Sequence, residues 1–400
     1  MKKTSVAVMT RYGFPAVQSG GTVRSVKSFA DSFSSSLDIS VYSLNKDIHS
    51  QKELQGVVPG KLVPLRGWHS MHCNRGVVGY LSLLMLALRK KPDYLYLNSF
   101  FDVFFSILPY LIFRIFLART KIVLAPRGEF SVLALKIKKR RKLFFLKFVS
   151  FFNIYKNITW QASTELEKVQ IINAKITKKP RVLIASDMVD LPVDREFDEA
   201  FFRNKIMTSL KSNVISLCYL SRVTPIKNLE FCVEVLMHVE ASVNFNIYGV
   251  IEDDQYYARV SNKISLLPKN INVRFFGPVS RDQLESTFNK NCLFFLPTLG
   301  ENFGHAIFES LCFGLPVLVS NATPWRDLET HGCGWDISLE CIEDYVKAIE
   351  RFAQLTLDER IAMSRCANEF VKIRYSKSAV FEQNKGLFPG LETVKGRGVT

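Results

Sequence analysis

The sequence lacks the cysteine pattern of a disulfide scaffold or a zinc module. Its eight cysteines are scattered, and none forms a CxxC pair or a cysteine and histidine cluster with zinc spacing. Several fall in apolar strand or helix patterns, where cysteine acts as a small hydrophobe. This usage excludes a disulfide framework and favours a reducing compartment.

The sequence also lacks low-complexity tracts, a signal-peptide h-region and an uninterrupted membrane span. Met1–Thr4 leads directly into the strand pattern SVAVMT, with no cleavage site. The most apolar stretch, Phe100–Ala118, is interrupted by Asp102, Pro109 and Arg114, whereas a span needs about 20 apolar residues. We therefore expect a buried helix there, and a cytoplasmic protein that contacts the inner face of the cell membrane peripherally.

Acidic residues are scarce in the first half of the chain. Residues 1–190 hold 30 Lys and Arg against 11 Asp and Glu, whereas residues 191–400 hold 23 against 26. Five consecutive bases, Lys138–Lys142, precede aromatics at helical spacing: Phe144, Phe145, Phe148, Phe151 and Phe152. Three interpretations stay open: an anionic membrane surface, which we favour, a solvated helix packed on the core, and nucleic acid, for which no recognised motif is present.

Short apolar strands alternate with helical patterns along the whole chain of 400 residues. Strands are expected at Ser5–Thr10, Asp38–Ser43, Lys61–Pro64, Asp93–Leu97, Lys121–Ala125, Asn157–Gln161, Asn213–Tyr219, Val243–Tyr248, Asn272–Phe276, Cys292–Leu296 and Pro316–Val319. Helices are expected at Thr22–Phe33, Val77–Leu88, Asp102–Leu117, Lys136–Phe152, Thr164–Asn173, Leu229–Val239, Asp254–Leu266, Arg281–Asn289 and Phe303–Phe313. This alternation is typical of parallel sheets covered on both faces.

The pattern runs twice, so we predict an α/β protein with two doubly wound, Rossmann-like domains facing across a cleft. The predicted domains are residues 1–190 and 191–375, joined near the polar stretch Leu191–Asp194. Residues 376–400 should form a C-terminal helix that packs back on the first domain.

The most informative segment is PTLGENFGHAIFESLCFGLPVLVS, Pro297–Ser320. It places Glu301 in a Gly/Asn loop after an apolar strand and Glu309 about two turns into the following helix. A helix N-terminus binds phosphate through its free N–H groups, and carboxylates bind hydroxyl groups by charge-assisted hydrogen bonds. This arrangement suits a nucleotide-sugar.

Other candidate residues also follow predicted strands, where ligands of doubly wound sheets bind. Arg222 and Lys227 stand where a strand becomes a helix, and two cations there suit a diphosphate. The pair Gly20 and Gly21 permits close backbone approach to a bound group. Gly249 follows another strand, and the turn Gly277–Val279 is placed to border a planar base. The acidic run Glu252–Asp254 is interpreted as solvated acid at a helix start rather than a metal site.

Taken together, SRVTPIKN, FFGPV, ENFGHAIFE, FGLPVLVS and TPWRDLETHGCGW resemble the retaining glycosyltransferases of family four, which have the two-domain GT-B fold. In the first half, SGGTVRSV and APRGEFSVLALKIKKRRK look like the subgroup that builds bacterial surface polysaccharides. The resemblance covers most of the chain, and the two-glutamate segment is its most specific part.

The resemblance implies roles for individual residues. Glu309 would bind the ribose hydroxyls and Glu301 would face the donor sugar, while Arg222 and Lys227 would hold the diphosphate and stabilise its charge. The remaining implied donor contacts are Gly20, Gly21, Gly249, Val279, Asn302, Phe303, Gly304, His305 and Ala306. Arg127 and Gly128 would lie on the acceptor side. No metal or other cofactor is expected, because Arg222 and Lys227 would supply the countercharge.

The sequence departs from the family at two places on the acceptor side. Gln161 stands where the family often has a histidine, and Ser186–Asp190 replaces a common Asn-Gly-Val/Ile-Asp run. Donor binding is less affected than acceptor contacts. His305 stands where many relatives have leucine, a change that preserves its backbone role.

The leading hypothesis is a retaining, metal-independent glycosyltransferase. It would move a sugar from a nucleotide-diphosphate donor to a lipid-linked oligosaccharide during O-antigen or capsule synthesis. One alternative is a nucleotide-sugar epimerase or hydrolase of the same fold, which needs no acceptor. The other is a non-enzymatic protein that binds membranes or nucleic acid through Lys136–Lys147.

Overall fold

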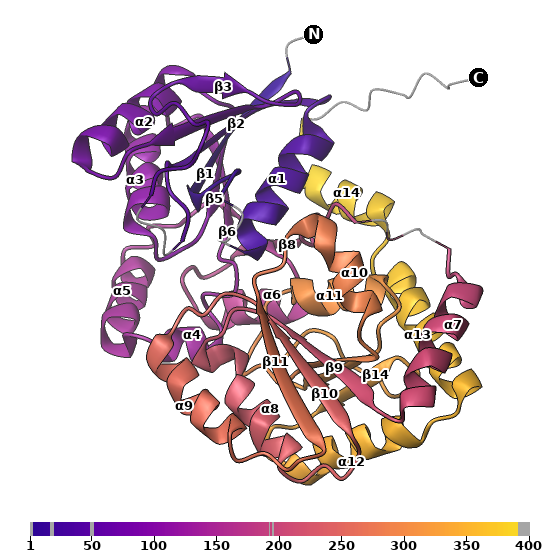
Figure 1. Cartoon of the computed structure of the whole chain (residues 1–400). Coiled ribbons are helices and arrows are strands. Elements are labelled where there is room, and N and C mark those ends of the chain that lie inside the picture. The colour runs from indigo at the N-terminus through magenta and orange to yellow at the C-terminus, as the bar shows by residue number, and fades with distance from the viewer. Residues whose placement is uncertain (1–2, 17–19, 49–51, 192, 194–195, 391–400) are drawn as a thin grey trace, which may run out of the picture. The chain divides into compact units, whose positions relative to one another are not determined.

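The computed structural model describes residues 3–16, 20–48, 52–191, 193 and 196–390. The chain forms two compact units (Figure 1). The first comprises Met1–Asp190 together with Lys377–Thr400, and the second comprises Leu191–Ser376. Pro192 and Asp194, in the expected joint, lie outside the described residues.

The first unit contains an eight-stranded sheet in the order β3-β4-β2-β1-β5-β6-β7-β8. Its strands are β1 (Thr4–Tyr12), β2 (Leu37–Leu44), β3 (Leu62–Pro64), β4 (His69–Cys73), β5 (Tyr94–Asn98), β6 (Lys121–Ala125), β7 (Thr159–Ala162) and β8 (Arg181–Ile184). All neighbours pair in parallel except β3 and β4, which are antiparallel. The expectation of a parallel strand at Lys61–Pro64 was therefore wrong, because β3 returns directly to β4 along the sheet edge.

Helices cover this sheet and supply much of its core. They are α1 (Gly21–Phe33), α2 (Val77–Arg89), the π-helical η2 (Val103–Ile107), α3 (Leu108–Phe116), α4 (Val132–Lys136), α5 (Lys139–Phe151), α6 (Glu165–Asn173) and the returning α14 (Lys377–Lys385). An apolar cluster that includes Leu97, Phe100, Tyr110, Leu146 and Trp160 joins β5, η2, α3, α5 and β7.

The second unit contains a six-stranded parallel sheet in the order β11-β10-β9-β12-β13-β14. Its strands are β9 (Ile215–Leu220), β10 (Val243–Tyr248), β11 (Ile271–Gly277), β12 (Leu293–Leu296), β13 (Val317–Ser320) and β14 (Gly334–Ile337). Its helices are α7 (Glu199–Ser212), η3 (Pro225–Lys227), α8 (Leu229–Leu236), α9 (Asp254–Ile264), η4 (Arg281–Gln283), α10 (Leu284–Asn289), α11 (His305–Cys312), α12 (Ile342–Gln354) and α13 (Leu357–Arg374).

The sequence patterns missed three strands, β4, β8 and β14, for local reasons. The strand β4 is HSMHC, which lacks the β-branched residues that mark strands, and β14 is GWDI, which contains Gly and Asp. The strand β8 is RVLI and directly follows the polar stretch Thr177–Pro180. The expected helix Lys136–Phe152 is two helices, because Lys138 adopts a left-handed conformation with φ of 54° between α4 and α5.

The helix α14 packs within the first unit, as predicted, but it ends at Lys385, and residues 391–400 of the expected segment 376–400 lie outside the described residues. The ring of Phe381 stacks on Phe33 of α1 with centroids 4.4 Å apart. Beyond the helix, Phe388 is fully buried against the rings of Phe29, Tyr94 and Tyr96. The end of the chain therefore completes the core of the unit in which the chain begins.

The apolar stretch Phe100–Ala118 forms η2 and α3, but it is not a fully buried helix. Phe105, Tyr110 and Phe113 are buried, whereas Ile115 is 72% and Phe116 is 71% exposed. Within the part of the chain that the structure describes, none of the helices combines the length and the apolar character needed to cross a bilayer.

Candidate functional site

The candidate donor residues of the second unit follow the carboxyl ends of four adjacent parallel strands. Arg222 and Lys227 come after β9, Gly249 after β10, Val279 after β11 and Glu301 after β12. Because these strands run in the same direction, their following loops meet at one edge of the sheet. These residues are spread over 80 positions in the sequence, but the order of the strands in the sheet brings their loops close together.

Lys227 and Glu301 form an ion pair at this edge. The ammonium group of Lys227 donates to Glu301 Oε1, and both side chains are largely buried, at 14% and 13% exposure. The backbone holds the two loops together, since Leu299 N donates to Ile226 O at 2.9 Å and Asn228 Nδ2 donates to Pro297 O at 3.0 Å. An ammonium group has three N–H donors. Lys227 can therefore donate to a phosphate with its other N–H groups while Glu301 fixes the orientation of the lysine side chain.

Arg222 forms an ion pair with Glu252, with 2.6 Å between Arg222 Nη1 and Glu252 Oε2. The interpretation of Glu252 as a solvated acid was therefore wrong: Glu252 is 18% exposed and restrains the guanidinium group. Its neighbour Asp253 does begin a helix, because its carboxylate accepts from Tyr256 N at 2.8 Å and caps α9.

Gly249 is required by close backbone packing between the strand ends. Its φ is 142°, and a Cβ atom there would lie 1.8 Å from the carbonyl oxygen of Ser221. Gly249 N also donates to Gly277 O at 2.8 Å. Glycine at this position therefore lets the loops after β9, β10 and β11 lie close together, with Val279 two residues beyond Gly277.

The loop after β12 ends in α11, whose start has no side-chain cap. Gly304 is the N-cap residue, with φ of 80°. The first N–H groups of a helix have no acceptor within the helix, and this end carries the positive pole of the helix dipole. The Trp325 indole donates to Phe303 O at 2.6 Å and fixes the approach to the helix. Asn302, His305 and Ala306 lie beside this start and are partly exposed.

Glu309 lies on α11 as the fifth helical residue, slightly more than one turn from the start rather than two. It is 3% exposed, in a helix whose last six residues are all buried. A carboxylate in this setting is rigidly placed, which suits recognition of hydroxyl groups. Both glutamates of the segment therefore belong to the same end of the second unit as the α11 N-terminus.

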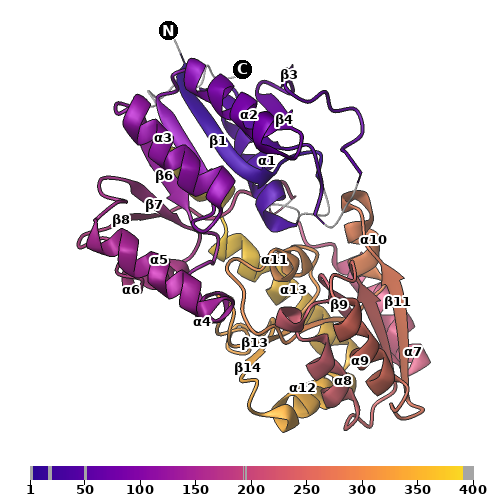
Figure 2. The same cartoon turned by 90° about the vertical axis from the view of Figure 1, so that its left-hand side faces the viewer.

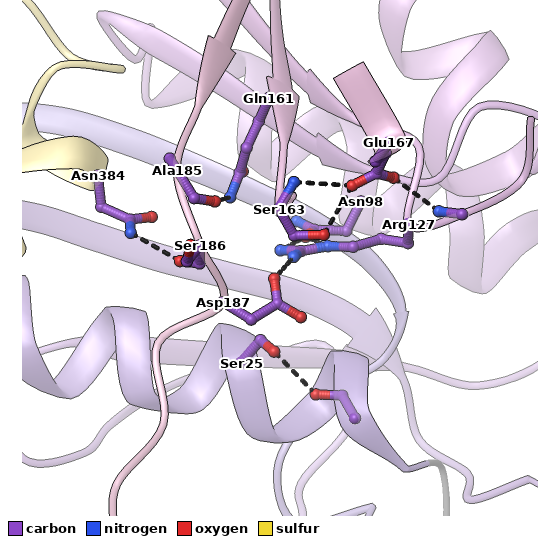
Figure 3. Close-up of polar contacts among 12 residues, drawn as sticks. Ser25, Asn98, Arg127, Gln161, Ser163, Glu167, Ala185, Ser186, Asp187 and Asn384 are labelled. Atoms are coloured by element: carbon purple, nitrogen blue, oxygen red, sulfur yellow. Dashed lines mark hydrogen bonds and ion pairs between the residues drawn. The ribbon is translucent and has the colours of Figure 1, made fainter. Parts of the chain in front are cut away.

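In the first unit, Arg127 is the centre of a buried polar network (Figure 3). It lies just after β6, forms an ion pair with Asp187 after β8, and donates to Asn98 Oδ1 and Tyr96 Oη of β5. Burial alone would lower the pKa of the guanidinium group, but the Asp187 carboxylate reverses this and raises the pKa. Arg127 therefore stays charged, and its side chain is 11% exposed.

Glu167 of α6 holds the loops beside Arg127. Its Oε1 accepts from Gly128 N at 2.7 Å, and its Oε2 accepts from Ser163 N at 2.8 Å and Ser163 Oγ at 2.7 Å (Figure 3). Gln161, in place of the family's histidine, is also buried, and it accepts from Tyr96 Oη and donates to Ala185 O. Arg127 and Gly128 are thus part of a fixed scaffold at the carboxyl ends of β5 to β8.

Gly20 and Gly21 begin α1 after β1. Gly20 is the N-cap, with φ of 80°, and a Cβ there would meet no atom within 4 Å. The position therefore needs glycine for its backbone conformation and not for close packing. Val17, Gln18 and Ser19, which precede it, lie outside the described residues.

Sequence reasoning missed the partners of the predicted residues. Glu252 was assigned to solvent, Trp325 was noticed only within a family motif, and Asp187 was named only as a departure. Each partner lies on a different strand end from the residue that it holds. The position of each partner just after a strand could have indicated a place near the site. That position does not indicate which side chains are in contact.

The fold is that of the GT-B glycosyltransferases, with two parallel-sheet, Rossmann-like domains. Similar solved structures include a sucrose-phosphate synthase from Thermosynechococcus elongatus, with a TM-score of 0.74 and 13% identity over 96% of this chain and 98% of that one. Anabaena Alr3699/HepE in complex with UDP-glucose has a TM-score of 0.65 and 14% identity, covering 96% and 99%. WaaG, a glycosyltransferase involved in lipopolysaccharide biosynthesis, has a TM-score of 0.65 and 15% identity, covering 96% and 100%.

Residues 201–369 match the family model described as "Glycosyl transferases group 1". This range includes the loops after β9 to β12 and all of α11. Most of the second unit is therefore similar in sequence to the group 1 glycosyltransferases. A search of curated proteins finds no significant sequence match.

Proposed function

We propose that this protein is a retaining glycosyltransferase that uses a nucleotide-diphosphate sugar. The observation that carries this proposal is the Lys227–Glu301 ion pair beside the uncapped start of α11, with Glu309 on the same helix. Similar structures have been solved with UDP-glucose and with UDP-2-fluoro glucose. The match to the group 1 family over the same segment supports the assignment.

In the proposed reaction, the bond between the anomeric carbon and the diphosphate breaks and negative charge builds on the leaving group. Lys227, Arg222 and the α11 N-terminus would stabilise that charge, an effect worth about 2.7–4 kcal/mol for one donor of this kind. These cations would make a metal unnecessary. Glu301 would hold Lys227 and face the sugar, and Glu309 would bind the ribose.

The remaining donor contacts follow from their place at the strand ends. Gly249 and Val279 would border the base, and backbone groups of Asn302, Phe303, Gly304, His305 and Ala306 would meet the phosphate and sugar. Gly20 and Gly21 would contribute backbone from the first unit. Arg127 and Gly128 would position the acceptor-side loops, because both are engaged in the buried network.

The donor-binding role is tested by Glu309→Gln, which keeps the side-chain shape. We expect donor affinity to fall about tenfold or more, as when a hydrogen bond to a charged group is lost. Calorimetric titration with a panel of nucleotide-sugars measures this, and Glu369→Gln on the exposed face of α13 is the control. Equal affinity in the two variants would refute the role of Glu309.

We further propose that the acceptor is a lipid-linked oligosaccharide, reached from the cytoplasmic face of the membrane, as in the synthesis of surface polysaccharides such as O-antigen. The α5 surface, defined as Lys138–Lys142 with Phe144, Phe148, Phe151 and Phe152, supports this. Its four aromatics are 74%, 46%, 83% and 60% exposed, so these rings do not pack into the core. Exposed aromatics beside a run of bases suit an anionic bilayer surface.

Vesicle sedimentation tests the α5 surface. Phe144→Ser with Phe151→Ser should release the protein from vesicles that contain phosphatidylglycerol, because the aromatic anchors are lost. The matched control is Leu266→Ser with Ile373→Ser, two equally exposed apolar residues of the second unit. Equal release of both variants would count against a docking role.

Product analysis separates transfer from the alternative chemistry. Transfer with retention predicts that donor is consumed only with acceptor and that NMR shows the donor's anomeric configuration in the product. Rapid donor consumption without acceptor would instead favour an epimerase or hydrolase.

A further inference from the structure

A polar cavity lies in the first unit, at the amino ends of the strands. It is lined by the first residues of β5, β6, β7 and β8, namely Tyr94, Lys121, Thr159 and Arg181. The Arg127 network lies at the carboxyl ends of the same strands, so the two sites are at opposite edges of the sheet. The cavity measures about 290 Å³.

Among the residues that the structure describes, four cations line this cavity and no carboxylate does. They are Arg114 at the end of α3, Arg119 in the following turn, Lys121 and Arg181. Among the described residues, the side chains of Arg119 and Arg181 make no hydrogen bond or ion pair. Like charges gathered without a counterion repel one another, so the arrangement favours binding of an anion.

The remaining lining is suited to hold a small anion in place. Arg114 is fixed by donating from Nη2 to the carbonyl oxygens of Lys156, at 2.7 Å, and Asn157, at 3.3 Å. The Tyr94 hydroxyl donates to Pro389 O at 2.6 Å and lies 3.5 Å from the Lys121 ammonium group. Arginines held in this way bind phosphate oxygens through paired N–H groups.

The size of the cavity limits the ligand. Ligand sites usually measure about 300–1,000 Å³, and this cavity, at about 290 Å³, lies just below that range. The four positive groups match a group with several negative charges in a small volume. From the cavity, its cations and its lack of acids, we propose that it binds a di- or triphosphate group, either free or on a lipid headgroup.

The test uses Arg119→Ala with Arg181→Ala, because both side chains are exposed and their loss should not disturb folding. All titrations are made in a Lys227→Ala background, so that the proposed donor site does not contribute. The matched control is Lys211→Ala with Lys269→Ala, which removes two exposed cations from the second unit.

We expect inorganic pyrophosphate to bind the Lys227→Ala protein in calorimetric titration. Affinity should fall about tenfold or more in the Arg119/Arg181 variant, from the loss of charge-assisted bonds, and stay unchanged in the control. A parallel arm measures sedimentation with phosphatidylcholine vesicles with and without diacylglycerol pyrophosphate, a lipid whose headgroup is a diphosphate. If the Arg119/Arg181 variant loses affinity for pyrophosphate but not for the vesicles, the ligand is a free anion. If the variant also loses binding to the vesicles, the ligand is a lipid headgroup.

The proposal is overturned if neither pyrophosphate nor diacylglycerol pyrophosphate distinguishes the Arg119/Arg181 variant from the control. Because Lys227 is absent throughout, that result would not bear on the proposed donor site. Conversely, loss of nucleotide-sugar binding in Glu309→Gln would leave the pyrophosphate result unaffected.

Discussion

Arg127 and Lys205 are both buried cations, but they are held in different ways. Arg127 has a carboxylate partner in Asp187 and two neutral ones in Asn98 and Tyr96. Lys205 of α7 donates to Phe288 O at 3.3 Å and lies over the Phe202 ring. Burial lowers the pKa of Lys205 to about 8. One cation is therefore compensated, and the other carries an energetic cost at neutral pH.

Removing one partner of the Arg127–Asp187 ion pair should strongly destabilise the protein. Arg127→Met or Asp187→Asn leaves a buried charge without its partner, and each should lower the free energy of unfolding by about 3–5 kcal/mol. The double variant should cost less than the sum, because neither charge remains. Urea denaturation measures all three.

The control is the same double-mutant cycle on the Lys168–Glu165 ion pair at the surface. For that pair we expect an interaction energy of about 0–1 kcal/mol. Additive effects at Arg127 and Asp187 would mean that the charges are not coupled.

Replacement of Lys205 should change stability in a pH-dependent way. Between pH 8 and the usual lysine pKa of 10.5, the unfolded chain holds a proton that the folded chain has lost, so stability rises with pH. Lys205→Met should therefore be more stable than the parent chain at pH 7, by about 1–3 kcal/mol, and this advantage should shrink towards pH 10. Denaturation at several pH values measures the difference.

Lys211 is exposed on the same helix, so Lys211→Met is the control and should show no such trend. A Lys205→Met advantage that is constant with pH would contradict the lowered pKa.

At the scale of single elements, the start of α11 joins the fold to the proposed chemistry. Phe303, Phe308 and Trp325 pack their rings together, and the Trp325 indole holds the Phe303 carbonyl. Gly304 turns the chain into the helix in a left-handed conformation. Helix periodicity predicted α11, but its true start is two residues later than expected, because this tryptophan contact holds Phe303 outside the helix.

Gly304→Ala should therefore disturb more than the local backbone. The left-handed conformation costs about 1–2 kcal/mol with a Cβ atom, and here that atom would lie 3.0 Å from Trp325 Nε1. Gly332→Ala is the control: its φ is 62°, but its nearest neighbour, Cys366 Sγ, is 3.7 Å away.

We expect both variants to lose stability in thermal denaturation, and only Gly304→Ala to lose affinity for a nucleotide-sugar as well. Unchanged donor affinity in Gly304→Ala would separate α11 from the binding site.

At the scale of the whole molecule, the chain crosses from the first unit to the second and returns. Residues after the second unit supply α14 and Phe388 to the first core, and Asn384 donates to Ser186 O at 2.9 Å (Figure 3). The amino-terminal segment alone would leave the rings of Phe29, Tyr94 and Tyr96 without this partner. The helix α14 and the strand β1 therefore belong to the same unit, in which Figure 2 labels β1 and α1.

Phe388→Ala should weaken the first unit selectively, although Phe388 is close to the end of the chain. Truncating a fully buried phenylalanine costs about 3–5 kcal/mol. Amide hydrogen exchange should therefore accelerate in β1 and β5. Phe288→Ala, equally buried in the second unit, should instead accelerate exchange in β9 and β10. Identical exchange patterns in the two variants would contradict this division.

The amino-acid sequence by itself determined the alternation of strands and helices, the two Rossmann-like sheets, the strand-end positions of Arg222, Lys227 and Glu301, and the helical position of Glu309. These features follow from local periodicity and turn chemistry, which depend on residues close in the chain. Strands without β-branched residues, such as β4, or with Gly and Asp, such as β14, gave too weak a local pattern.

Only the tertiary structure decided which side chains meet. Lys227 pairs with Glu301 across 74 residues, Arg222 with Glu252, and Arg127 with Asp187. It also gathered Arg114, Arg119, Lys121 and Arg181 around one cavity. The physical reason is that the order of strands in a sheet sets which loops become neighbours, and that order depends on the packing of the whole chain.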